Sequence, residues 1–442
     1  MLTKARLIPI YFPNRDQGFD DQISHLNLLL SDVAEILPPV ALGSPLPDGD
    51  AVLFPQVLGD AYRMVDAIRA IPLPLLIVTS EFGTLSMWDW EIRTYLRGEV
   101  IETIAPYTLK QTRQICRALS VKRDLRRLKF VIYQDNPGEG FQPAIFKRFY
   151  WWENECTQRM FDKFGITIEK RSFKELGAEA KAIPDSEAEG VWQHWAGRLN
   201  LSHIEERQIL SALKVYLALS RSLDADDSIQ GLGINCLNES HFSDTTPCLA
   251  WNMLYEERGL IWGCEADTVS MLTKYLLHKS LDVPIMMTNL YPFRLGNAAL
   301  RHERIPSFPP VTGDPGDYIL AAHCGYFGVV PQSFASEWQM RPKVLEIVDP
   351  NSAVIDARMP EGPMTLAKIQ PSFDRMSVLE GELSGYAQFP DSDCVNGAVL
   401  HIADGHQMMQ RLASHHYLLM TGHNLPDIDM IASVFGITVN AQ

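Results

Sequence analysis

The chain lacks the features that would place it outside ordinary globular proteins. Its 442 residues contain no uninterrupted apolar run of about 18 residues, so no membrane span is indicated. With 46% hydrophobic and 21% charged residues, the composition also speaks against a disordered chain. The first eleven residues lack the apolar segment and cleavage site of a signal peptide. We therefore expect a cytoplasmic protein with no membrane partner.

Cysteine is sparse and is not arranged in pairs. No two cysteines form a C-x-x-C motif, and their number, seven, is odd. The seven are Cys116, Cys156, Cys236, Cys248, Cys264, Cys324 and Cys394. This pattern argues against both a disulfide framework and a structural zinc module.

Acidic residues outnumber basic residues, which gives a formal net charge of -15. Nucleic acid is therefore not expected as a partner, since phosphate binding depends on clustered Lys and Arg. One basic cluster occurs at residues 122–129, beside a predicted strand. It is interpreted as a solvated face or a contact between subunits, with an anion site as the alternative.

The first two thirds of the chain alternate strand and helix patterns. In the first third, apolar runs at 7–11, 51–54 and 73–78 alternate with helical periodicity at 22–37 and 61–70. A second series starts at 130–133 and continues past residue 231. Alternation of this kind predicts parallel sheets covered by helices, here as two Rossmann-like α/β domains.

The strongest boundary is the segment 305–317, whose four prolines and two glycines cannot continue a helix or a central strand. Short strand patterns follow it, separated by Asp, Gly and Pro, and predict an antiparallel sheet or barrel. These patterns lie at 318–322, 344–348, 364–369, 377–383 and 398–402. We predict three domains, residues 1–123, 124–305 and 306–442, the last being β-rich and barrel-like.

One apolar run ends in two carboxylates. Residues 260–264 are apolar, Glu265 and Asp267 follow, and an amphipathic stretch begins at residue 268. In open α/β sheets, ligands bind at the carboxyl ends of strands. Later histidines, His323 and the pair His415 and His416 with His423 close by, can complete a site of one carboxylate and two imidazoles that holds a divalent metal.

The order of these segments resembles the L-fucose isomerase and L-arabinose isomerase superfamily. The matching segments cover the C-terminal half and are residues 264–267, 283–289, 317–325 and 415–423. The resemblance implies an aldose-ketose isomerase that moves a proton between neighbouring carbons of a pentose, a deoxyhexose or a related sugar. It also implies a bound Mn²⁺, with Zn²⁺ or Co²⁺ as alternatives, and a homo-oligomer, a trimer or hexamer.

The resemblance assigns roles to particular residues. It implies that Glu265 is a metal ligand and the catalytic base, and that His323 and His416 hold the metal. His415 and His416 must point to opposite sides of a strand, so only one of them can line the site. For His323, a structural histidine without a ligand role is the alternative.

The sequence departs from the family at one position. Where the family has a second acidic ligand, this chain has Thr288 and Asn289. Asn289 can orient substrate or act as a weak ligand, but its amide cannot act as a base. Asp267 either replaces the missing acid or caps the helix that follows it.

Four further residues are predicted as substrate contacts. Glu239 and His241 follow another strand end, and His423 lies seven residues beyond His416. Trp88 belongs to an aromatic segment that packs against a sugar ring or serves as ordinary core. Two alternatives to an isomerase remain, namely a carbohydrate-binding relative without catalysis, and another metal-assisted reaction on a sugar derivative, such as epimerisation or carbon-carbon cleavage.

Overall fold

A computed structural model describes most of the chain as two compact units. Unit 1 comprises Met1–Arg126, Lys279–Asp282 and Pro426–Thr438, and unit 2 comprises Arg127–His278, Val283–Leu425 and Val439–Gln442. The first predicted boundary, after residue 123, lies close to Arg126, whereas residues 124–305 and 306–442 fall largely within unit 2. The described residues are 3–13, 15–55, 60–82, 88–136, 152–201, 203–293, 297–323, 325–342, 349–389, 392, 395–412 and 414–441.

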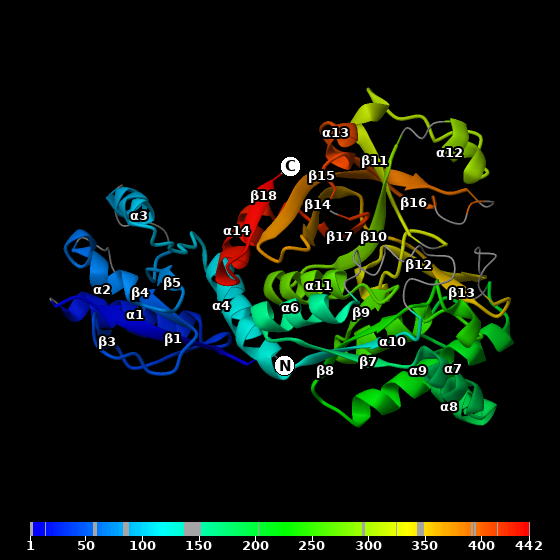
Figure 1. Cartoon of the computed structure of the whole chain (residues 1–442), viewed down its shortest axis with the longest axis horizontal. Helices are drawn as coiled ribbons and strands as arrows, with labels where there is room; N and C mark the ends of the chain where they lie inside the picture. Colours follow the sequence, from blue (N-terminus) through cyan, green and yellow to red (C-terminus); the bar gives the residue numbers. More distant parts are fainter. Residues whose placement is uncertain are drawn as a thin grey trace. The chain divides into compact units, whose positions relative to one another are not determined.

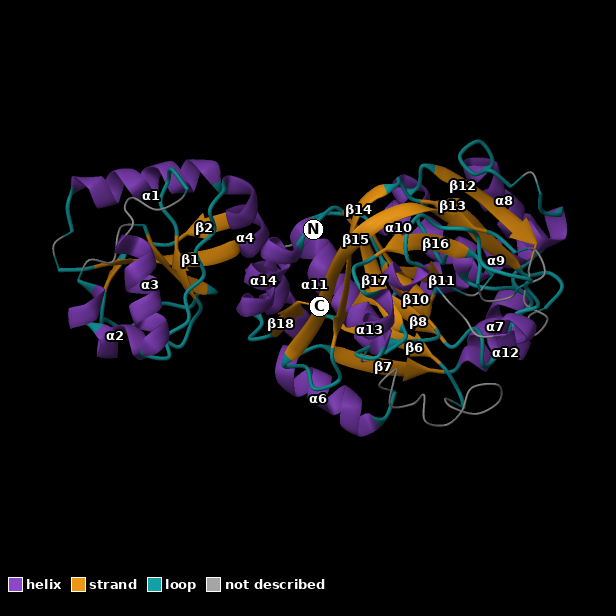
Figure 2. Cartoon of the chain, turned by 90° about the horizontal axis from the view of Figure 1, so that it is seen from above, coloured by secondary structure: helices purple, strands orange, loops and turns teal. Residues whose placement is uncertain are grey.

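Unit 1 contains a parallel sheet whose main strand order is β2-β1-β4-β5, with β3 also paired to β1. The central strands are buried because both faces carry apolar side chains, including Ile8, Val52 and Phe54. Figure 2 shows α1 on one side of this sheet. The strands are Ala5–Tyr11 (β1), Ala34–Ile36 (β2), Val40–Ala41 (β3), Ala51–Phe54 (β4) and Leu75–Ile77 (β5). The helices are Gln17–Leu29 (α1), Val65–Arg69 (α2), Trp88–Gly98 (α3), Leu109–Asp124 (α4) and Leu425–Val434 (α14).

The first half of unit 2 contains a second parallel sheet, in the order β7-β6-β8-β9. Figure 1 shows α6 and α11 along one face of this sheet and α9 on the other. Its strands are Lys129–Tyr133 (β6), Thr167–Arg171 (β7), Ile229–Ile234 (β8) and Ile261–Cys264 (β9). The helices are Asn154–Phe164 (α6), Phe173–Ala182 (α7), Asp185–Trp195 (α8), Glu206–Asp224 (α9), Cys248–Arg258 (α10) and Thr268–Leu281 (α11).

The second half of unit 2 is antiparallel. Six strands pair in the circular order β14-β17-β10-β11-β16-β15 and close into a barrel through the β14–β15 pairing, while β18 adds to β15. A separate hairpin joins β12 and β13. The strands are Ile285–Pro292 (β10), Tyr318–Ala322 (β11), Glu337–Pro342 (β12), Ala353–Arg358 (β13), Gly362–Ile369 (β14), Arg375–Ala387 (β15), Gly397–His401 (β16), His416–Thr421 (β17) and Thr438–Ala441 (β18). Two short helices, Asn297–His302 (α12) and Gly405–Met409 (α13), lie between strands.

Glycines let α11 approach the parallel sheet of unit 2 closely. A Cβ atom added to Gly263 of β9 would overlap the side chain of Met271, and one at Gly233 of β8 would lie 3.0 Å from the Met271 sulfur. A larger residue at either position would therefore push α11 away from the strands. This close packing places the start of α11 directly beside the carboxyl end of β9.

The coarse prediction of the fold is confirmed, because helix-covered parallel sheets precede a closed antiparallel barrel. Whether the parallel sheets are Rossmann-like in detail stays a prediction. The helical pattern at 22–37 was wrong in its second half, since α1 ends at Leu29 and β2 pairs with β1. The pairing of β2 with the apolar strand β1 therefore decides the structure of this segment, in spite of its helical periodicity. The predicted strand at 344–348 lies outside the described residues.

None of the helices in the described part of the chain combines the length and apolar character needed to cross a membrane.

Candidate metal centre

A tight turn delivers the two predicted carboxylates. After β9 ends at Cys264, Glu265 and Ala266 both adopt left-handed backbone conformations, with φ of 54° and 55°. For residues other than glycine this conformation costs about 1–2 kcal/mol. Two such residues in succession indicate that the surrounding structure holds the turn in place. Asp267 then precedes α11 and accepts a hydrogen bond from the backbone N–H of Ser270 at 2.8 Å. Asp267 therefore caps α11, which was one of the two roles predicted for it.

The structure brings Glu265, His323 and His416 together. These residues come from the end of β9, the end of β11 and the start of β17, and all three are buried. One candidate ligand atom from each lies within 4.8 Å of the others, and His416 Nε2 is 4.0 Å from Glu265 Oε1. A carboxylate oxygen and two imidazole nitrogens suit Zn²⁺, Co²⁺ or Mn²⁺.

The environment of His323 fits a ligand role. Its side chain is buried, and neither ring nitrogen has a hydrogen-bond partner among the described residues. Burial lowers the pKa of His323 well below its usual value, and His416, His415 and Lys274 lower it further. The neutral imidazole, which is the form that binds a metal, is therefore favoured.

A buried charge network orients His416. Its Nδ1 lies 2.8 Å from Asp267 Oδ2, the same oxygen that accepts a hydrogen bond from Lys368 Nζ at 3.0 Å. Burial alone would raise the pKa of Asp267, but Lys368 and His416 lower it below its usual range. Asp267 is thus ionised and fixes the ring so that Nε2 faces Glu265, as carboxylates do beside metal-bound histidines.

Asn289 is the residue predicted to orient substrate or to act as a weak ligand. In the barrel it is directly opposite His416 of β17 and Ala322 of β11. Its side-chain nitrogen donates to the Tyr291 hydroxyl at 3.4 Å, while its oxygen has no partner among the described residues. Asn289 is therefore next to His416 in the sheet, and its amide lacks the charge of a carboxylate.

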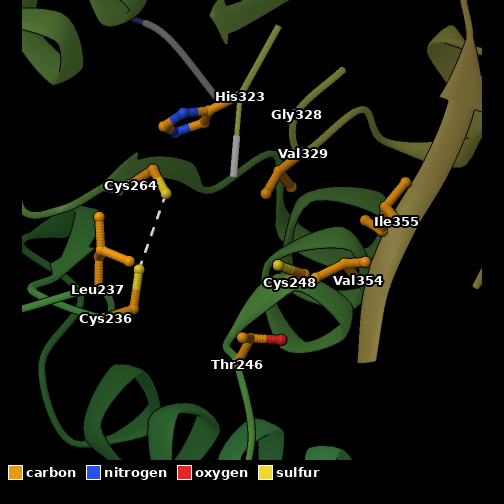
Figure 3. A pocket seen from close by; sticks show the side chains of 10 residues that line it. All are labelled: Cys236, Leu237, Thr246, Cys248, Cys264, His323, Gly328, Val329, Val354 and Ile355. Carbon is orange, nitrogen blue, oxygen red and sulfur yellow. Dashed lines mark hydrogen bonds between the residues drawn. The ribbon is translucent and has the colours of Figure 1, made fainter. Parts of the chain in front are cut away.

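A pocket borders this cluster, and His323 and Cys264 form part of its wall (Figure 3). The remaining wall is mostly apolar, and its residues are Cys236, Leu237, Thr246, Cys248, Gly328, Val329, Val354 and Ile355. A small ligand in this pocket would have one end at His323.

Glu239 and His241 make contacts of a different kind. The buried carboxylate of Glu239 accepts hydrogen bonds from the backbone N–H groups of Asp135 and Asn136, the residues that follow β6. Burial raises its pKa even though these bonds oppose the shift. His241 is exposed, and its ring lies 4.2 Å from that of Phe242. The described contacts of these two residues are thus with the segment after β6 and with Phe242.

His423 and Trp88 were the other two predicted substrate contacts. His423 lies beyond β17, where its Nε2 is 3.3 Å from the Gly381 carbonyl oxygen and 3.6 Å from Glu382. Trp88 begins α3 in unit 1, and its side chain lies outside the described residues. His423 therefore contacts β15, and a substrate contact for either residue stays a prediction.

Two buried lysines were not predicted as part of the site. Lys368 interrupts the apolar strand β14, and Lys274 interrupts the apolar helix α11. Lys274 donates to the Trp262 carbonyl oxygen at 2.9 Å and lies 3.5 Å from the centre of the Trp262 ring. Burial lowers the pKa of both lysines. A charge within an apolar run is the sequence signal that marks such residues.

No family model matches the chain, and no curated protein matches it.

Proposed function

We propose that the protein is a metal-dependent aldose-ketose isomerase, similar to the L-fucose and L-arabinose isomerases. The observation that carries the proposal is the buried cluster of Glu265, His323 and His416, which borders a pocket partly lined by His323. These are the positions at which the resemblance implies the metal ligands. The substrate would be a pentose, a deoxyhexose or a related sugar, and the protein a homo-oligomer.

In this proposal each buried residue has a defined role. Glu265, His323 and His416 hold Mn²⁺, or Zn²⁺ or Co²⁺ in its place, and Asp267 orients His416. The metal, when bound, polarises neighbouring oxygens of the sugar. Glu265 accepts the proton from one carbon and returns it to the next, because a buried carboxylate is a suitable base. Burial around the cluster limits the access of water.

The presence of a single carboxylate among the proposed ligands limits both the proton transfer and the metal affinity that we expect of the site. Asn289 can hydrogen-bond a sugar hydroxyl through its amide but cannot accept a proton. With one carboxylate, the site carries less negative charge than a pair would supply. We therefore expect weaker binding of Mn²⁺ than in a site with two carboxylates.

Metal binding is tested first, separately from catalysis. Protein purified without chelators should contain a divalent metal, and Co²⁺ titration should give the absorption of a protein-bound ion. Glu265→Gln should lose this signal while the fold is retained, because it removes the only carboxylate of the cluster. Asp356→Asn is the matched control, since Asp356 is a buried carboxylate bonded to Arg341 and Gln339. Equal metal binding by wild type and Glu265→Gln would exclude the assigned ligand.

Catalysis is tested with a panel of aldoses in the presence of Mn²⁺. The wild type should convert at least one of them to the ketose, and Glu265→Gln should not. Sugar binding without conversion, measured by calorimetry, would instead support a carbohydrate-binding protein. Conversion to an epimer or to cleavage products would support another metal-assisted reaction.

Restoring an acid at Asn289 tests the missing ligand. Asn289→Asp places a carboxylate directly opposite His416, so it should raise the affinity for Mn²⁺ by about tenfold or more. Asp is close to Asn in shape, so the barrel should tolerate the change. Calorimetric titration measures the affinity. An unchanged affinity would mean that the side chain of residue 289 does not reach the metal.

A further inference from the structure

Two thiols meet at the wall of the pocket beside the candidate centre. Cys264 is the last residue of β9, and Cys236 follows β8, its neighbour in the parallel sheet. Their sulfur atoms lie 3.7 Å apart, and the two side chains point toward each other (Figure 3). They are 28 residues apart in the chain and share no C-x-x-C motif, so sequence spacing alone does not reveal the pair.

The pair is placed where a small oxidant can reach it. Both cysteines line the pocket, and Cys236 is only partly buried. Cys248 lines the same pocket, but burial raises its pKa to about 12, which keeps it a protonated and unreactive thiol. Burial has the same effect on Cys116. Cys236 and Cys264, in contrast, have sulfur atoms in contact at 3.7 Å and both line the pocket.

The sulfur atoms must move closer together for a bond to form. A disulfide has a sulfur-sulfur bond of about 2.05 Å, so the two atoms must approach each other by less than about 2 Å. Rotation of the side chains with a small backbone adjustment covers such a distance. The segment that would adjust contains Glu265, the residue directly after Cys264, which is held in a left-handed conformation with φ of 54°.

We propose that Cys236 and Cys264 form a redox-reactive pair that a peroxide converts into a disulfide, and that this modification weakens metal binding by displacing Glu265. The disulfide requires no metal, whereas its effect on affinity rests on the proposed metal centre.

The reaction is balanced with hydrogen peroxide as the oxidant. The sulfur of Cys236 attacks the peroxide, the O–O bond breaks, and a sulfenic acid and water are formed. The sulfur of Cys264 then displaces the hydroxyl group, which leaves as a second water when it takes the thiol proton. The two thiols lose two electrons and two protons, and the peroxide is reduced to water.

The modification is tested by peptide mass spectrometry of the full chain after brief peroxide treatment and alkylation. A peptide linking Cys236 to Cys264 should appear and should disappear after reduction with dithiothreitol. Cys236→Ser should abolish it, whereas Cys156→Ser, which changes a buried cysteine of α6, should not. If both cysteines are alkylated equally before and after treatment, or if Cys236 links to another cysteine, the proposal is wrong.

The effect on the metal is measured by Co²⁺ titration of reduced and oxidised protein. Oxidation should weaken Co²⁺ binding about tenfold or more, because changes in the residues that position metal ligands commonly have effects of this size. Peroxide-treated Cys236→Ser should keep the affinity of the reduced protein. A disulfide that forms without changing the affinity would overturn the coupling to Glu265. If reduced protein binds no metal, the proposed function fails while the result on the disulfide stands.

Discussion

At the scale of residues, Asp267 has two partners that depend on its charge, Lys368 and His416. We expect Asp267→Asn to lower the affinity for Mn²⁺ about 10- to 100-fold, because the amide orients His416 less well. It should also lower the free energy of unfolding by about 3–5 kcal/mol, because Lys368 remains buried without its counter-charge. Calorimetric titration and urea unfolding measure the two effects. The double variant Asp267→Asn/Lys368→Met should regain much of the stability but not the affinity for Mn²⁺. If the single and the double variant were equally stable, the ion pair between Asp267 and Lys368 would not contribute to stability as proposed.

At the scale of elements, the contact between β9 and α11 sets the position of Glu265. Gly263→Ala would make residue 263 overlap Met271, so we expect a loss of about 1–3 kcal/mol in unfolding free energy from overpacking. The affinity for Mn²⁺ should fall as well, because the turn that carries Glu265 begins two residues later. Gly190→Ala in α8 is the control, since nothing lies within 4 Å of the added Cβ. It should stabilise the helix by about 0.5–1 kcal/mol and leave the affinity unchanged. Unchanged affinity in Gly263→Ala would show that the turn is set by other contacts.

At the scale of the whole molecule, the candidate centre belongs to unit 2, although the chain passes between the two units five times. Within unit 1, Asp427 of α14 binds Lys110 and Gln111 of α4 at 3.1 and 3.0 Å. Asp427→Ala should therefore cost about 1–3 kcal/mol of stability. Its effect on Mn²⁺ affinity should be small, because changes at independent sites act separately. Hydrogen exchange with and without Mn²⁺ should show added protection in unit 2. A large loss of affinity in Asp427→Ala would show that the units are energetically coupled.

Much of the fold was predictable because its signals are local. The apolar run before Cys264 and the amphipathic stretch from Thr268 correspond to β9 and α11. The Pro-rich segment does interrupt regular structure, but it connects β10 to β11, which pair within the barrel, and so lies inside unit 2. The end of α1 was not predictable in this way, since β2 exists through pairing with β1. Helical periodicity is a property of one segment, whereas an edge strand depends on its neighbour.

The sequence by itself determined the chemical types available: two carboxylates after an apolar strand, histidines near two later strands, and an amide at residue 289. That Glu265, His323 and His416 meet was decided by the tertiary structure, through the packing of α11 and the closure of the barrel. The same holds for Asp267, which is 149 residues from His416 and 101 from Lys368 in the chain. Local patterns report which face of an element is buried, but charge pairing and a shared pocket depend on which buried faces meet.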